Sequence, residues 1–287
     1  MLRGLYTAAS GMIAQQRRHD TVTNNISNIN TPGYKQTNAV TRSFPEMLLA
    51  MTGVDGADRA PIGQWTSGVF AEESLSIHLQ GDLTQTNQSS DFALVSNLEV
   101  EGLAFDQSGK TIGPDGEAVF QPQAFFTVQD AAGEIRYTRG GKFTVNGEGF
   151  LMTSDGSNVL GTGGTPIQLP PGVGLDSLIL TEDQRFVDSD GVEIGAQLLI
   201  TRIENPNDLV REGNGNFRFV ADEGVARPIE AGERIEVRQG YVERSNVDSA
   251  QSAVDLMAAL RAYEANQKVI QFYDQSLQKA ANEIGRV

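Results

Sequence analysis

The sequence predicts an α+β protein, with paired, coiled-coil-like long helices at its N- and C-termini and a β-rich domain inserted between them. Both ends of the 287-residue chain carry apolar residues at alternating spacings of three and four. Between them lie most of the 31 glycines and many short β-like runs separated by Gly, Asp and Asn turns. We therefore expect a discontinuous helical assembly domain, 1–75 with 240–287, and a β-rich outer domain, 76–239.

The N-terminal segment predicts a helix whose stripe is apolar first and polar later. We expect this helix to end near residues 28–31, because Asn favours the left-handed conformation of a C-cap and Pro32-Gly33 cannot continue a helix. The residues of the stripe are Leu2, Leu5, Ala9, Met12, Gln16, His19, Thr23 and Ile26.

The C-terminal segment predicts a longer helix, over about 247–284, which would extend roughly 57 Å at 1.5 Å per residue. Ser245-Asn246 is its expected N-cap. Its stripe is too narrow to be buried alone, so we predict that it pairs with the N-terminal helix. The residues of this stripe are Ala253, Leu256, Leu260, Tyr263, Gln267, Ile270, Asp274, Leu277, Ala281 and Ile284.

The middle of the chain carries hairpin signals. Asn146-Gly147 is the strongest, because this dipeptide adopts the tight turn that joins two antiparallel strands. Such turns every 8–12 residues indicate a small sandwich, an open barrel or a set of meanders. Residues 44–51 are expected to form a short helix.

Composition excludes several classes of protein. A formal net charge of −15 disfavours nucleic-acid binding, which needs a basic face. The absence of cysteine excludes disulfides and thiol chemistry. No run approaches the ~18 apolar residues of a membrane span, and the first residues do not resemble a cleaved signal peptide, so we expect neither membrane insertion nor a signal-peptide route.

No motif indicates catalysis, a metal site or a cofactor. His19 and His78 are the only histidines, and we interpret each as a surface or interface imidazole. Asp188-Ser189-Asp190-Gly191 resembles part of a calcium loop, but the first and twelfth positions would be Phe186 and Gln197, so a hairpin turn is the better interpretation. The chain is therefore predicted not to be an enzyme.

Two blocks of sequence are unusual. Residues 24–30 hold four Asn, which are unfavourable inside a helix because their amides compete for the backbone. This block is either an ordinary frayed helix end or a set of contacts between subunits. The second block, residues 260–267, ends in Gln267 at a stripe position, which either fixes helix register or lies on a solvated face.

These blocks resemble the motifs of flagellar rod and hook proteins. The first match runs from Ala8-Ala9-Ser10-Gly11-Met12 through Asn24-Asn25-Ile26-Ser27-Asn28 to Thr31-Pro32-Gly33-Tyr34-Lys35. The second covers Gln239–Val247 and Arg261-Ala262-Tyr263-Glu264-Ala265-Asn266. Residues 125–151 also resemble the middle domain of rod proteins. The stretch 92–123 departs from the family pattern, so the resemblance does not identify a particular rod protein. A hook-basal-body protein of the Gram-positive type is among the members that the chain resembles.

The resemblance implies a structural subunit of the flagellar axis, located in the basal body and exported by the flagellar type III apparatus. Its implied partners are copies of itself and other rod or hook proteins, with no cofactor. A hook or junction component, a surface adhesin and a wall hydrolase with a helical stalk remain as alternatives.

The resemblance also implies that matching residues make assembly contacts. The candidates are Asn24, Asn25, Asn28, Asn30, Thr31, Pro32, Gly33, Tyr34, Gln239, Gly240, Ser245, Asn246, Val247, Leu256, Leu260, Arg261, Tyr263, Glu264, Asn266, Gln267, Ile270 and Leu277.

Overall fold

The computed structural model describes most of the chain. The described residues are 2–45, 47–50, 61–65, 67–72, 74–96, 98, 100, 102–106, 109–113, 116, 118–219, 226–230 and 233–284. They form two compact units. Unit 1 comprises Met1–Ser27, Thr37–Leu75 and Asp248–Val287, and unit 2 comprises Asn28–Gln36 and Ser76–Val247.

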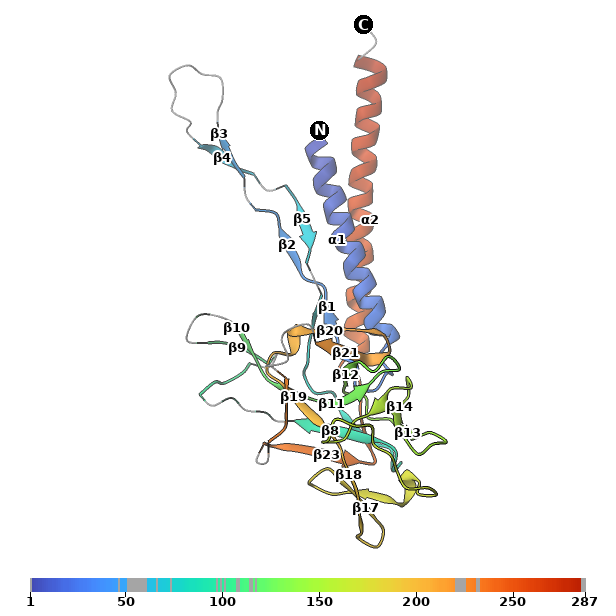
Figure 1. Cartoon of the computed structure of the whole chain (residues 1–287). Coiled ribbons are helices and arrows are strands. Elements are labelled where there is room, and N and C mark those ends of the chain that lie inside the picture. The colour runs from blue at the N-terminus through green and yellow to red at the C-terminus, as the bar shows by residue number, and fades with distance from the viewer. Residues whose placement is uncertain are drawn as a thin grey trace. The chain divides into compact units, whose positions relative to one another are not determined.

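Unit 1 contains the two long helices, α1 and α2, which lie side by side (Figure 1). Helix α1 spans Leu2–Ser27, and α2 spans Ser249–Lys279 and continues into one π-helical turn, Ala280–Ile284. The N-cap of α2 is Asp248, not the expected Ser245-Asn246 pair. Its carboxylate accepts hydrogen bonds from the backbone N–H of Ala250 and Gln251, at 2.8 and 3.0 Å.

The helices do not have the coiled-coil-like packing that the stripes predicted. The buried residues are mostly small or polar: Ala8, Ala14, Val22 and Asn25 on α1, and Ser252 and Ala259 on α2. In contrast Leu260, an expected seam residue, is 42% exposed. The α+β class and the β-rich middle are confirmed, but the prediction of a long paired coiled coil is wrong.

Small side chains explain the difference. A Cβ on Gly4 would collide with the ring of Tyr273, and one on Gly11 would lie 3.1 Å from the amide of Asn266. Arg18 pairs with Asp255 at 3.1 Å further along. The face of α2 that α1 covers is therefore chosen by close approach at glycine and alanine, not by burial of leucine.

Residues 44–51 were expected to form a short helix, and that prediction is wrong. Met47–Ala50 is strand β3, paired with β4, Pro61–Trp65; Met51 lies outside the described residues. Strand β2, Thr41–Ser43, pairs with β5, Val69–Ala71. Pairing with a distant strand supplies the hydrogen bonds that a short helix would have made for itself. Strands β1 and β6 are Thr37–Asn38 and Leu75–Ser76.

Unit 2 is built on an antiparallel sheet around β11, Gln123–Gln129. Within the described part of the chain its strand order is β13-β14-β15-β11-β12-β21-β20, with β19 pairing to β11 and to β22. The other strands are β12 (Ile135–Thr138), β13 (Phe143–Val145), β14 (Leu151–Thr153), β15 (Asn158–Val159), β19 (Ile200–Ile203), β20 (Leu209–Arg211), β21 (Asn216–Phe219) and β22 (Ala226–Pro228). The predicted Asn146-Gly147 turn joins β13 to β14.

Smaller sheets complete unit 2, and their strands pair antiparallel. The two-stranded pairs are β7 (Leu83–Gln85) with β24 (Tyr241–Glu243), β8 (Phe92–Ser96) with β23 (Ile235–Gln239), and β9 (Lys110–Ile112) with β10 (Ala118–Phe120). One three-stranded sheet contains β16 (Leu178–Leu180), β17 (Arg185–Asp188) and β18 (Glu193–Gln197). Short 3₁₀ helices lie at Leu175–Ser177, Pro206–Asp208 and Gly213–Gly215.

Two aromatic clusters form the core of unit 2. Successive side chains of a strand point to opposite faces, so Phe125 and Phe126 on β11 enter different clusters. The ring of Phe126 packs edge-on against Phe143, with centroids 5.3 Å apart. Phe125 packs against Phe217 at 5.7 Å. Both faces of β11 are therefore buried.

Candidate functional site

The candidate site is the place in unit 2 where the chain enters from α1 and leaves towards α2. We call it the junction: residues 28–36 together with 239–247. The backbone N–H of Gly33 donates to the carbonyl of Glu243 at 2.9 Å. Gly33 has a φ of +69°, and a Cβ there would lie 2.5 Å from the backbone of Arg139, so glycine is required. The two segments are thus joined directly.

Asn246 links the junction to a third strand-like segment. Its side-chain oxygen accepts from the backbone N–H of Gln36 at 2.7 Å. Its amide nitrogen donates to the carbonyls of Ile77 and Leu79, at 2.9 and 3.2 Å. One side chain therefore fixes three pieces of chain that are far apart in the sequence.

A buried ion cluster lies beneath these contacts. The Glu243 carboxylate accepts from the Lys35 ammonium at 2.6 Å and from the Arg139 guanidinium at 3.0 Å. The backbone N–H of Gly81 donates to the same carboxylate at 2.9 Å. Arg139 also donates to the carbonyl of Ala124 at 2.7 Å. All three charged side chains are buried, so each depends on the others for compensation.

The charges shift one another's proton affinities. Burial lowers the pKa of Lys35 to about 8, helped by the positive charge of Arg139, although Glu243 opposes the shift. Burial alone would raise the pKa of Glu243, but Arg139 and Lys35 outweigh it and hold that pKa below its usual value. Glu243 is therefore a carboxylate, and Lys35 is mostly charged at neutral pH.

His78 is also part of this buried region, and its interpretation as a surface or interface imidazole is wrong. It is only 8% exposed, between the rings of Phe125 and Phe217, with centroids 6.1 and 5.8 Å away. Neither ring nitrogen has a hydrogen-bond partner in the described part of the chain. Burial, together with the nearby cations Lys35, Arg139 and Arg211, lowers the pKa of His78 to about 3, so the ring is neutral.

Most of the predicted assembly residues are buried or half-buried within the chain. Buried candidates are Asn25, Gly33, Tyr34 and Val247; half-buried ones are Asn28, Thr31, Pro32, Gln239, Gly240, Ser245, Asn246, Leu256, Tyr263, Asn266, Ile270 and Leu277. Exposed candidates are Asn24, Asn30, Leu260, Arg261, Glu264 and Gln267.

Gln239 and Asn25 show how the polar candidates are used. The Gln239 amide donates to the carbonyls of Ser89 and Leu178, both at 2.9 Å, and its oxygen accepts from the N–H of Leu180 at 3.0 Å. The Asn25 side chain makes two hydrogen bonds with the Thr37 backbone in unit 1, at 2.8 and 3.0 Å. The motif amides therefore act as side-chain links between backbone segments.

Sequence reasoning missed the central groups of the cluster, Arg139 and Glu243. Both lie inside segments already singled out, but nothing in their spacing shows that residues 104 positions apart form an ion pair. No local signal marks the pair, because Arg139 has Arg136 and Lys142 nearby and Glu243 is followed by Arg244.

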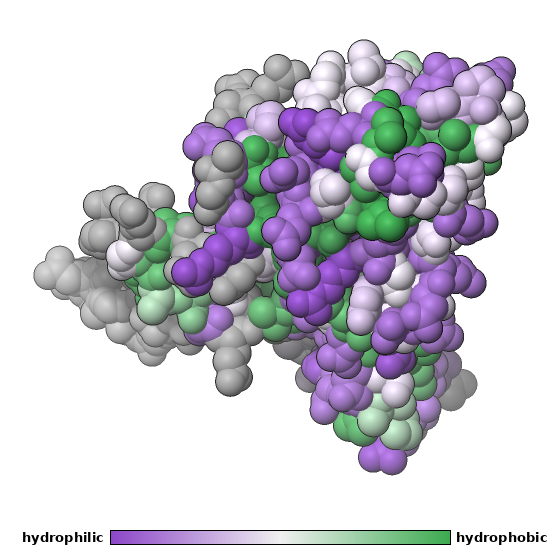
Figure 2. Space-filling model, turned by 90° about the horizontal axis from the view of Figure 1, so that it is seen from below, coloured by the Kyte–Doolittle hydropathy of each residue, from purple (hydrophilic) through white to green (hydrophobic). Residues whose placement is uncertain are grey.

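The described residues show no group of three His, Cys, Asp or Glu side chains placed to hold a metal. In the same residues no helix is long and apolar enough to span a bilayer. The surface seen in Figure 2 is mostly hydrophilic, with hydrophobic residues in small groups. Taken together, the links at the junction suit a mechanical role: within unit 2 they tie the segment that follows α1 to the segment that precedes α2.

Comparison with known proteins identifies the class. The family model of the flagella basal body rod protein matches residues 5–35, that of the flagellar hook protein FlgE/F/G D1 domain matches 120–194, and that of the flagellar basal body rod FlgEFG protein C-terminal matches 238–283. The first and third include the two halves of the junction. The fold and these matches define an axial protein of the bacterial flagellum.

Curated relatives cover the whole chain. The flagellar hook-basal body complex protein FlhO of Bacillus subtilis is 36% identical over 100% of both chains. The flagellar basal-body rod protein FlgG is 32% identical in Borreliella burgdorferi over 98% of both chains, and 30% identical in Agrobacterium fabrum over 96% of both. The chain belongs to the flagellar basal-body rod and hook-basal-body protein family.

The predicted role is therefore confirmed: the chain is a structural subunit of the flagellar axis, located in the basal body, and it interacts with other proteins of that axis. The adhesin and the wall hydrolase are not favoured.

Proposed function

We propose that the chain joins the flagellar axis through the exposed face of α2, with unit 1 as the assembly domain and unit 2 as the outer domain. The observation that carries this proposal is a stripe of large apolar side chains left open on α2. Val254, Met257, Leu260, Val269 and Phe272 are each between 40% and 66% exposed.

The stripe lies on one side of the helix, as two apolar groups that the exposed residues Arg261, Glu264 and Lys268 separate along the axis. At 100° per residue, Val254, Met257, Val269 and Phe272 fall within an arc of about 120°. Ser252 and Ala259, which are covered, point to the other side. We call the exposed set the outer stripe. Burying one such side chain contributes about 1.5–3 kcal/mol, so the outer stripe offers enough driving force for a lasting contact.

The occupant of the outer stripe is a neighbouring axial subunit. An exposed apolar face of this length on a soluble acidic chain favours association. Family membership supplies the partner, since the relatives are basal-body rod and hook-basal-body proteins. The exposed candidates Leu260, Arg261, Glu264 and Gln267 lie on or beside this face, where the polar ones would select the partner and register.

The proposal also covers the route of export and the absence of enzymatic activity. The chain leaves the cell through the flagellar type III apparatus, without a cleaved signal peptide and without inserting into the membrane. It has no enzymatic activity, because the charged groups of the buried cluster, Lys35, Arg139 and Glu243, are paired to one another instead of facing a substrate.

The test is to replace Met257→Asp and Phe272→Asp together in a strain that lacks the native gene. Both side chains are exposed, so the purified variant is expected to keep its thermal stability while rods and motility are lost. The matched control is Ile112→Asp, another exposed apolar residue, 71% exposed on β9 in unit 2, which should leave motility intact. Normal rods with the double variant would refute the proposal.

A further inference from the structure

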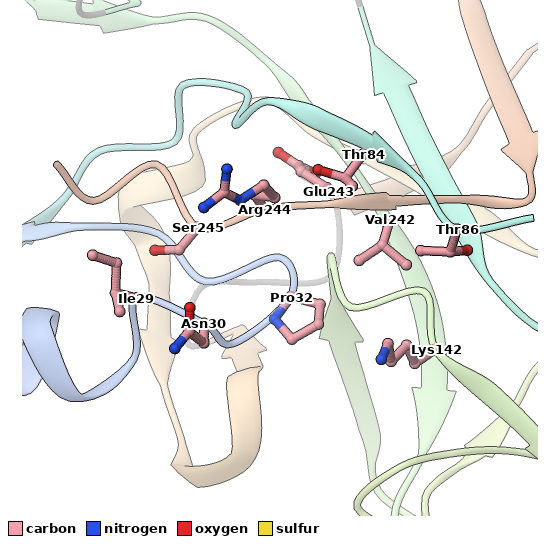
Figure 3. A pocket seen from close by; sticks show the side chains of 10 residues that line it. All are labelled: Ile29, Asn30, Pro32, Thr84, Thr86, Lys142, Val242, Glu243, Arg244 and Ser245. Carbon is pink, nitrogen blue, oxygen red and sulfur yellow. The ribbon is translucent and has the colours of Figure 1, made fainter. Parts of the chain in front are cut away.

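Unit 2 has a groove beside the junction that none of the contacts above uses. Its volume is about 260 Å³. Apolar atoms of Ile29, Pro32 and Val242 line it, and the polar lining residues are Asn30, Thr84, Thr86, Lys142, Glu243, Arg244 and Ser245 (Figure 3). We call it the basic groove.

The charge of the groove is positive in a chain whose net charge is −15. Lys142 and Arg244 are exposed and lie on opposite sides of Pro32 in Figure 3. Among the described residues neither makes an ion pair. The carboxylate of Glu243 is occupied in the buried cluster, so it does not neutralise them. Two available cations over an apolar floor fit a ligand with two carboxylates and one apolar group.

The turn between β17 and β18 carries that combination. We call residues 188–193 the acidic tip. The N–H of Gly191 donates to the carbonyl of Asp188 at 2.8 Å, which confirms the predicted hairpin turn. Asp190 is exposed, and Val192 is 64% exposed beside it. The acid at the end of the tip, Glu193, is paired with Arg185 at 3.0 Å. Asp188 and Asp190 make no ion pair within the described residues, although Oδ1 of Asp188 accepts from the backbone N–H of Ser189 at 2.7 Å.

We propose that the basic groove receives the acidic tip of a second copy of this chain. Asp188 and Asp190 would pair with Lys142 and Arg244, and Val192 would cover the apolar floor. The tip of the same chain does not line its own groove. Such a contact joins different surfaces of two identical chains, so it does not close on itself and repeats along a filament. The inference rests on the proposed polymerisation and names a second contact for it, on unit 2.

The chain lacks cysteine, so single thiols test the contact directly. Thr84→Cys places a thiol at the groove, and Val192→Cys places one at the tip. Both variants are co-expressed in a strain without the native chain, and isolated basal bodies are treated with a short bis-maleimide. We expect a cross-linked dimer. Ile112→Cys replaces Val192→Cys in the control, and that pair should give no dimer.

Charge reversal then tests the recognition. Lys142→Glu with Arg244→Glu in the Thr84→Cys chain should lower the dimer yield about fivefold or more, because two attractions become repulsions. Asp188→Lys with Asp190→Lys in the Val192→Cys chain should restore it. Lys142, Arg244 and Asp190 are exposed, and Asp188 is half-buried at the end of β17, so circular dichroism of each purified variant should match the parent.

Three results would overturn the inference. In basal bodies that contain both variants, a dimer yield no higher than that of the Ile112→Cys control would exclude the contact while leaving the proposed function intact. A cross-link from Thr84→Cys to a different flagellar protein would exclude a second copy as the occupant. Basal bodies that are complete without this chain would reject the proposed function, and the inference with it.

Discussion

Replacing His78 by phenylalanine should make the protein resist acid. The ring lies between Phe125 and Phe217, and both of its nitrogens lack a partner in the described part of the chain. A buried polar group without a partner costs about 1–3 kcal/mol. Since His78→Phe keeps an aromatic ring and removes that cost, we expect the free energy of unfolding at pH 7 to be equal to or above that of the parent.

The size of the acid effect follows from the pKa difference. The pKa of His78 is about 3 in the folded chain, against an ordinary value of 6.5. Between these values the unfolded chain binds one more proton than the folded chain, so the free energy of unfolding falls as the pH drops below about 6.5. Each pH unit is worth about 1.4 kcal/mol. Between pH 6.5 and about 4.5 the parent therefore loses about 3 kcal/mol through this residue alone.

The neighbouring charges set the direction of this effect. Protonating His78 would add a positive charge beside Lys35, Arg139 and Arg211, with Glu243 as the one buried anion identified in this cluster. Glu243 also titrates in acid, because its pKa is lowered, but it does so in parent and variant alike. The difference between the two proteins therefore isolates the histidine.

Urea unfolding followed by far-ultraviolet circular dichroism, at several pH values from 7 down to about 4.5, measures the effect. We expect the free energy of unfolding of His78→Phe to fall less steeply with decreasing pH than that of the parent, by about 1.4 kcal/mol per pH unit, which is the slope for one proton. Ile135→Phe, at a side chain that is 51% exposed on β12, changes no titratable group and is the control, so its slope should match that of the parent. Equal slopes for parent and His78→Phe would refute the assignment of a buried, neutral histidine.

Two further changes test the junction and the core. Glu243→Gln leaves two buried cations without a counter-charge and should lower the free energy of unfolding by about 3–5 kcal/mol, measured by urea titration. The control Glu236→Gln removes an exposed ion pair and should change that free energy by almost nothing. Similar losses in the two variants would contradict the buried cluster. Gly141→Ala would push a Cβ into the backbone carbonyl of Phe92 and should lower the free energy of unfolding by more than about 2 kcal/mol, measured by thermal unfolding. The control Gly147→Ala has open space around it and should be near neutral. A neutral Gly141→Ala would contradict the close approach of Gly141 to Phe92.

The features that were predicted correctly from the sequence are those that local interactions determine. The Asn146-Gly147 turn and the turn at Asp188-Ser189-Asp190-Gly191 were predicted, because turn residues act on backbone dihedrals within four positions. The end of α1 at Ser27 followed from Pro32-Gly33 and the asparagines before it. The paired motifs at the two ends of the chain were enough to indicate the family.

Tertiary structure alone decided which residues meet. Alternating spacings of three and four fit two neighbouring stripes of a helix, and only the close approach at Gly4 and Gly11 selects the stripe that is covered. Residues 47–50 became a strand because β4 was available to pair with them. Glu243 meets Lys35 from 208 positions away, and His78 is buried beside them. Contacts of this kind depend on the folding of the whole chain, because charge compensation and burial are properties of position in space and not of neighbours in sequence.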